Sequence, residues 1–112
     1  MTTGPESPKA RVEEMVLEGL YARIGKIDRG IVGMLRQRLD AVIAVARIKD
    51  LLGKNTEKEA NRDEVLTDRD KEMQAVGYPA GTGRAIWTDI EDVTVAVGKA
   101  VRATKRTSVP RE

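Results

Sequence analysis

Two cations stand on the apolar stripe of a predicted helix, within the stretch GMLRQRLDAVIAVARIK at residues 33–49. Arg38 precedes Val42 by four residues and Lys49 follows Val45 by four, so both cations share the stripe of the apolar side chains. Lys49 comes eleven residues after Arg38, which is about three turns and roughly 16 Å along a helix axis. Because a buried, unpaired charge is costly, this spacing favours a doubly negative ligand between the two side chains.

The alternative role of these cations is structural. Long basic side chains on a helix often pack their aliphatic stems against apolar neighbours while the charged heads reach water. A second charged group weighs against this alternative, because the stretch EANRDEVL, at the start of the next predicted helix, carries Arg62 and Asp63. Both interpretations stay open on the residues alone.

The residue inventory limits the chemistry that the chain can perform. Its 112 residues include no cysteine and no histidine. Disulfides and thiolate chemistry are therefore excluded, as are the commonest general base and the commonest metal ligand. Any catalysis has to use carboxylates, lysine, arginine, tyrosine or backbone groups.

Charge and hydropathy indicate which partners to expect. The net charge is +2, basic residues alternate with acidic ones, and the aromatics are Tyr21, Tyr78 and Trp87, which are too few for a platform that stacks bases. No apolar run approaches a membrane span, and no signal segment is recognisable. We expect no nucleic acid and no membrane as partners, and a cytoplasmic location.

One very long helix is predicted to position Arg38 and Lys49, the two cations on its apolar stripe, which are called the seam cations below. Ser7 followed by Pro8 is typical of an N-cap and a first helical residue, and helical apolar spacing then continues without proline to Gly53. Such a helix holds roughly 45 residues and is about 65 Å long. The rest of the chain is too short to enclose it, which predicts pairing with a second copy. Four internal glycines should make it fray or bend unless tertiary contacts compensate: Gly19, Gly25, Gly30 and Gly33.

Two shorter helices are predicted after this one. The second begins within or just after GKNTEKEANRDE, with Thr56 or Asn61 as its N-cap, and runs to about Val76. The stretch GYPAGTG then forces a turn, and a third helix begins near Thr82 or Arg84. We interpret GTGR as a turn with Thr82 as N-cap. Asp68 and Asp70 are interpreted as part of a solvated helix face that also carries Arg69 and Lys71. Trp87 is interpreted as a core or dimer contact.

The predicted fold class is all-α, because no strand pattern or internal repeat is present. Residues 8–106 form a single helical domain in this prediction. A flexible tail precedes the domain at residues 1–7, and another follows it at residues 107–112.

The helical segments resemble those of the AroQ-type chorismate mutases over roughly residues 20–101. The first helix of that family opens with an L-R-x-x-I-D-x-I-D pattern, continues to a seam arginine and reaches a lysine eleven residues later. The stretch LYARIGKIDRGIVGMLRQRLDAVIAVARIK is similar, and EANRDEVL resembles the start of the second helix. The matching positions are Leu20, Ile24, Ile27, Asp28, Arg38 and Lys49.

This resemblance implies three helices with a long first helix, in an intertwined homodimer of the chorismate mutase II type. It also implies an isomerase that carries out the [3,3] rearrangement of chorismate to prephenate, a step in making aromatic amino acids or secondary metabolites. The reaction needs no nucleophile, metal, cofactor or proton transfer. The site holds a dicarboxylate in its reactive conformer and places cations near the breaking ether bond. Some family members need an activating partner enzyme.

The resemblance assigns roles to individual residues. Arg38 would bind one carboxylate, Lys49 a carboxylate and the ether oxygen, and Arg62 would assist at the pocket mouth as the third catalytic residue. Asp63, with Glu59, would accept a hydrogen bond from the ring substituent. Helix capping is the alternative for both acids. The distance from Lys49 to this cluster is one residue longer than usual, so Glu64 is an alternative to Asp63.

Three positions depart from the family pattern within the expected substrate-binding set. Tyr21 stands where an arginine reaches into the partner's site, Val97 replaces a Gln or Glu near the ether oxygen, and Val93 replaces a small polar residue unless Thr94 turns inward. A missing cation or donor costs roughly 3 kcal/mol of transition-state stabilisation. Two alternatives follow: the same fold acting as a 4-amino-4-deoxychorismate mutase or isochorismate pyruvate lyase, or a catalytically silent helical dimer that binds a partner protein.

Overall fold

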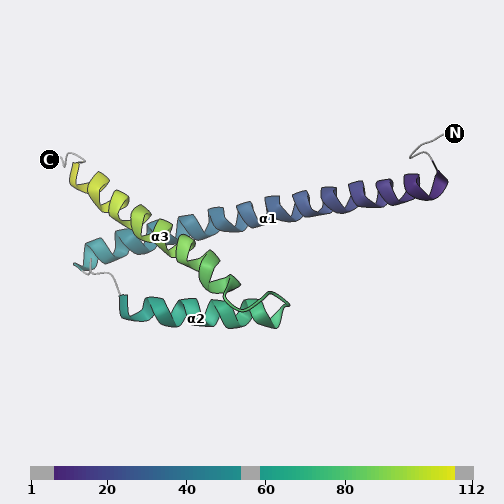
Figure 1. The fold of residues 1–112 in the computed structure, drawn as a ribbon. Helices are drawn as coiled ribbons and strands as arrows, with labels where there is room; N and C mark the ends of the chain where they lie inside the picture. The colour runs from purple at the N-terminus through teal and green to yellow at the C-terminus, as the bar shows by residue number, and fades with distance from the viewer. Residues whose placement is uncertain (1–6, 54–58, 108–112) are drawn as a thin grey trace. The chain divides into compact units, whose positions relative to one another are not determined.

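The computed structural model describes residues 7–53 and 59–107, with side chains described for residues 7–53 and 61–104 (Figure 1). Three helices follow one another: α1 (Pro8–Leu52), α2 (Glu59–Ala75) and α3 (Thr82–Thr107). No strand occurs in these two described ranges, so the all-α fold class is confirmed. The chain divides into two compact units, residues 1–38 and residues 39–112, and α1 contributes to both.

Both predicted ends of α1 are confirmed by hydrogen bonds. At the first turn, the Ala10 amide donates to Ser7 Oγ at 3.1 Å, so the Ser7 hydroxyl caps the helix. At the last turn, Gly53 has a φ of 71° and its amide donates to the Asp50 carbonyl at 3.1 Å. The helix holds 45 residues and continues as one α-helix through all four internal glycines.

The apolar side chains of α1 are largely exposed in the single chain. Apart from the half-buried Val42 and Ile43, its larger apolar residues, from Val12 to Leu52, keep 38% to 73% of their surface accessible, and Ala46 is the residue of α1 that is buried. Elsewhere in the described ranges, Leu66 of α2 is the buried large hydrophobic residue. The described residues therefore form a small core and leave most of the apolar surface of α1 exposed.

Helix α2 ends in a turn that prepares the start of α3. The Tyr78 amide donates to the Met73 carbonyl and the Gly77 amide to the Gln74 carbonyl, both at 3.0 Å, with Gly77 at a φ of 108°. This is the Schellman pattern, which requires a left-handed residue and so favours glycine. The helix ends at Ala75, close to the predicted Val76.

The N-terminus of α3 is capped by a residue of α2. Asp70 accepts hydrogen bonds from the Gly81 amide through Oδ2 and from the Arg84 amide through Oδ1, both at 3.1 Å. The backbone amides of Arg84 and Gly81 hold the pKa of Asp70 below its ordinary value, because they stabilise the ionised carboxylate. Asp70 is thus a tertiary helix cap, a role that the solvated-face interpretation did not include, and Thr82 is the first residue of α3 and not its N-cap.

The GTGR stretch combines a turn with a close approach of two helices. Gly81 has a φ of 93° and fits the predicted turn. Gly83 is buried, and a Cβ atom on it would lie 2.5 Å from the Arg69 carbonyl oxygen and 2.6 Å from Asp70 Cα. Helices α2 and α3 therefore meet backbone to backbone at Gly83, and they form a hairpin (Figure 1).

The other sequence predictions on α2 and α3 have mixed outcomes. Helix α2 begins at Glu59, so Asn61 lies inside it and is not its N-cap, while Thr56 lies outside the described residues. The tail at 1–7 falls outside them except for Ser7, and so does the tail at 107–112 except for Thr107, which is helical. Trp87 is half-buried, and the Arg69 guanidinium stands over its ring at 6.0 Å from the centroid, a cation–π contact between the two helices.

Candidate active site

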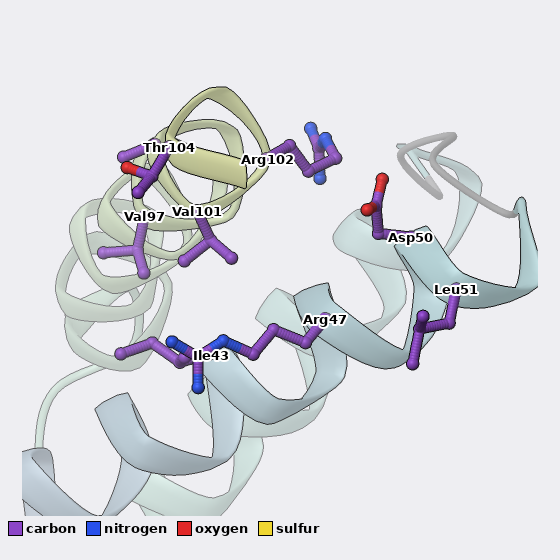
Figure 2. Close-up of a pocket in the computed structure, with 9 residues that line it drawn as sticks. Ile43, Arg47, Asp50, Leu51, Val97, Val101, Arg102 and Thr104 are labelled. Atoms are coloured by element: carbon purple, nitrogen blue, oxygen red, sulfur yellow. The ribbon is translucent and has the colours of Figure 1, made fainter. Parts of the chain in front are cut away.

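Residues 39–112 contain a cavity of about 570 Å³ (Figure 2). Helix α1 contributes the first part of its lining and α3 the second: Ile43, Arg47, Asp50 and Leu51, then Val97, Ala100, Val101, Arg102 and Thr104. In Figure 2, Val97 and Val101 point from α3 toward the side where Arg47 lies, and the side chains of Asp50 and Arg102 point toward one another. The lining is mostly apolar and includes the charged residues Arg47, Asp50 and Arg102, which suits an amphipathic small molecule or segment.

This cavity is lined by a face of α1 that does not carry the seam cations. Arg47 lies two residues before Lys49, so the two side chains leave the helix about 200° apart. Val97 is the one residue of the sequence-predicted site that lines the cavity in the described part of the chain. Arg38 and Lys49 are both half-buried on α1.

Arg62 crosses from α2 to α3. Its Nη2 donates to Asp92 Oδ1 at 2.5 Å and to the Thr88 carbonyl oxygen at 3.3 Å. The Arg62 side chain is 24% exposed and that of Asp92 is 60% exposed. The guanidinium is thus held near the hairpin surface, within reach of a ligand that approaches from solvent.

Asp63, the next residue, also contacts α3. Arg84 donates from Nη1 to Asp63 Oδ1 at 3.0 Å and from Nη2 to Thr67 Oγ1 at 2.7 Å. Asp63 remains largely exposed and Glu64 is exposed as well. Helix α3 therefore fixes the position of both charged residues that the sequence analysis singled out at the start of α2.

A comparison with protein families shows which family the chain belongs to. The model of the family "Chorismate mutase type II" matches residues 20–99. The chain belongs to the chorismate mutase type II family. The AroQ resemblance is thereby confirmed, and the three-helix, all-α fold agrees with it.

The chorismate mutase match spans the residues that carry the predicted chemistry. It covers Arg38 and Lys49 on α1, Arg62 and Asp63 on α2, and Val93 and Val97 on α3. It begins twelve residues after the first residue of α1, so the helix extends beyond the matched region. Neither the curated proteins nor the solved structures gave a match. No helix in the described ranges combines the length and apolar character that a transmembrane segment needs.

The predicted roles of the site residues toward a ligand stay predictions for this chorismate mutase-like protein. Tyr21 and Val93 are exposed, and the side chain of Glu59 lies outside the described set. The Thr94 hydroxyl donates to the Ile90 carbonyl of its own helix at 2.9 Å, so it is engaged with the backbone.

Sequence reasoning missed residues that the structure places beside the candidate site. Arg84 and Asp92 contact the two α2 residues, and Arg47 lines the cavity. The only signal for Arg47 is its spacing of four from Ile43 and Leu51, which marks one helix face. Nothing in the local sequence pairs Arg62 with Asp92, because the two residues are 30 positions apart.

Proposed function

We propose that this chorismate mutase type II protein converts chorismate to prephenate by a [3,3] rearrangement. The observation that carries the proposal is the family match over residues 20–99 together with the cations inside it at Arg38, Lys49 and Arg62. A dicarboxylate substrate needs cations of this kind at separated points, and the rearrangement needs no acid, base or nucleophile. The absence of histidine and cysteine is therefore compatible with the reaction.

In the proposed mechanism, the seam of α1 provides the electrostatic part of catalysis. Arg38 binds one carboxylate, while Lys49 binds a carboxylate and faces the ether oxygen, where negative charge develops as the C–O bond breaks. Fixed cations stabilise that charge more in the transition state than in the ground state. Holding the enolpyruvyl side chain over the ring contributes the remaining rate enhancement by removing unproductive conformers.

We further propose that the active form is a homodimer. The support is the exposed apolar surface of α1, which is larger than an isolated soluble helix normally presents to water. A second copy of α1 offers the same surface, as a symmetric interface requires. The proposal also gives Tyr21 a place, since the resemblance puts this position in the partner's site.

Sedimentation tests the dimer. We expect twice the chain mass of 12.3 kDa at micromolar concentration, because burying the apolar side chains of α1 is the main source of stability that one copy lacks. Ile27→Asp, in the middle of the stripe, should shift the species toward one chain mass. The control Arg29→Gln changes the charge equally at a position about 200° further round the helix and should leave the dimer intact. A single-chain mass for the unsubstituted protein would contradict the proposal.

Turnover tests the reaction itself. Purified protein should consume chorismate, followed by ultraviolet absorbance, with prephenate as the identified product. Tyr21, Val93 and Val97 favour a second candidate, since they replace polar groups of the family pattern, so 4-amino-4-deoxychorismate and isochorismate are assayed beside chorismate. Turnover of one of these in place of chorismate would keep the proposed roles of Arg38 and Lys49 and would change only the substrate. If the protein neither converts nor binds any of the three compounds, that result would favour a catalytically silent helical dimer that binds a partner protein.

A further inference from the structure

Two groups of α3, one helical turn apart, hold the Arg62 side chain. The Thr88 carbonyl oxygen and the Asp92 carboxylate both accept from Arg62 Nη2, at 3.3 Å and 2.5 Å. An arginine side chain has many rotamers, and two acceptors on a neighbouring helix select among them. Helix α3 therefore restrains the conformation of Arg62, although Arg62 itself belongs to α2.

The exposure of the pair argues for a functional reason behind this contact. Ion pairs that water can reach contribute little to folding stability, and the Asp92 side chain is 60% exposed. The α2–α3 hairpin has other attachments, namely the Asp70 cap and the close approach at the buried Gly83. The two helices thus have contacts that do not involve Asp92, whereas Asp92 contacts the guanidinium of Arg62 directly.

We propose that Asp92 is a positioning residue that holds Arg62 in the orientation that receives an anionic group of the substrate. This inference rests on the proposed function, in which Arg62 assists at the mouth of the pocket. A guanidinium fixed before the ligand arrives loses less conformational freedom on binding than a free one. Asp92 acts through Arg62 alone and makes no contact with the substrate.

A double-substitution cycle tests the role. Asp92→Ala should raise KM about tenfold and leave kcat within about twofold, because Arg62 at the pocket mouth binds ground state and transition state alike. Asp92→Glu, which keeps the carboxylate, should recover part of the loss. In the Arg62→Ala background, Asp92→Ala should change KM no further, since the group it positions is gone. Asp89→Ala removes an exposed carboxylate from the same helix and is the matched control.

The outcomes separate this role from a structural one and from failure of the proposed function. An effect of Asp92→Ala that persists in the Arg62→Ala background would overturn the positioning role. So would a KM change that follows a fall in melting temperature, or equal effects in the Asp89 control. If the unsubstituted protein neither turns over nor binds any chorismate-type substrate, the proposed function falls and the positioning role falls with it. If the protein converts a chorismate-type substrate but the effects of Asp92→Ala and Arg62→Ala on KM are additive, only the positioning role is overturned.

Discussion

Lys49→Ala should lower kcat/KM for chorismate by at least about a hundredfold, the loss seen when one fixed donor to a developing negative charge is removed. Lys49 is half-buried in the last turns of α1, on the apolar seam. Water that replaces the ammonium group has to reorient as charge develops, whereas the lysine is already in place. Because the ether oxygen gains charge only in the transition state, most of the loss should fall on kcat.

The same variant separates catalysis from folding. Its helical circular dichroism should match that of the unsubstituted protein, since alanine is the best helix former and one seam cation is removed from an apolar stripe. Thermal stabilisation by a chorismate-like dicarboxylate should disappear. Lys26→Ala, which removes an exposed lysine from the same helix, is the control and should change neither property. Unchanged turnover in Lys49→Ala would show that Lys49 is not a residue of the active site.

Gly83→Ala should destabilise the fold by about 1–3 kcal/mol, the usual cost of adding a methyl group where no space exists. The new Cβ atom would meet the Arg69 carbonyl oxygen at 2.5 Å and Asp70 Cα at 2.6 Å. Both are backbone atoms, so no side-chain rotation relieves the contact and α3 has to move away from α2. That movement also lengthens the hydrogen bonds by which Asp70 caps α3.

Chemical denaturation measures this effect, and Gly98→Ala is its matched control. Gly98 is also a buried glycine inside α3, but a Cβ atom there meets only the Arg102 guanidinium, at 3.5 Å. Since alanine is favoured over glycine in a helix by up to about 1 kcal/mol, Gly98→Ala should be neutral or stabilising. Equal effects of the two substitutions would contradict the close approach at Gly83.

The sequence predicted the parts of the fold that depend on local chemistry. The two ends of α1 follow from Ser7, Pro8 and Gly53, whose preferences act within one helical turn. The turn after α2 was predictable for the same reason. The family resemblance followed from the spacing of Arg38 and Lys49 along one stripe, which a single helix preserves.

The tertiary contacts that the sequence analysis missed or misread join residues that are distant along the chain. Asp70 was interpreted as a surface charge because its partners, the amides of Gly81 and Arg84, follow 11 and 14 positions later. Gly83 carries no sign of the backbone that lies against it. The Arg62–Asp92 pair depends on how α3 packs on α2, and helical periodicity contains no information about that register.

The Asp70 cap has a consequence for the order in which the chain folds. The carboxylate that caps the first turn of α3 comes from α2, so we expect the two helices to form together and not one after the other. The contacts that join them close loops of 11 to 30 residues, and such local contacts form quickly. In the proposed homodimer, in contrast, the apolar surface of α1 is covered only when two chains meet, which is a slower, concentration-dependent step. We expect the α2–α3 hairpin to form in each newly made chain before α1 acquires its final surroundings.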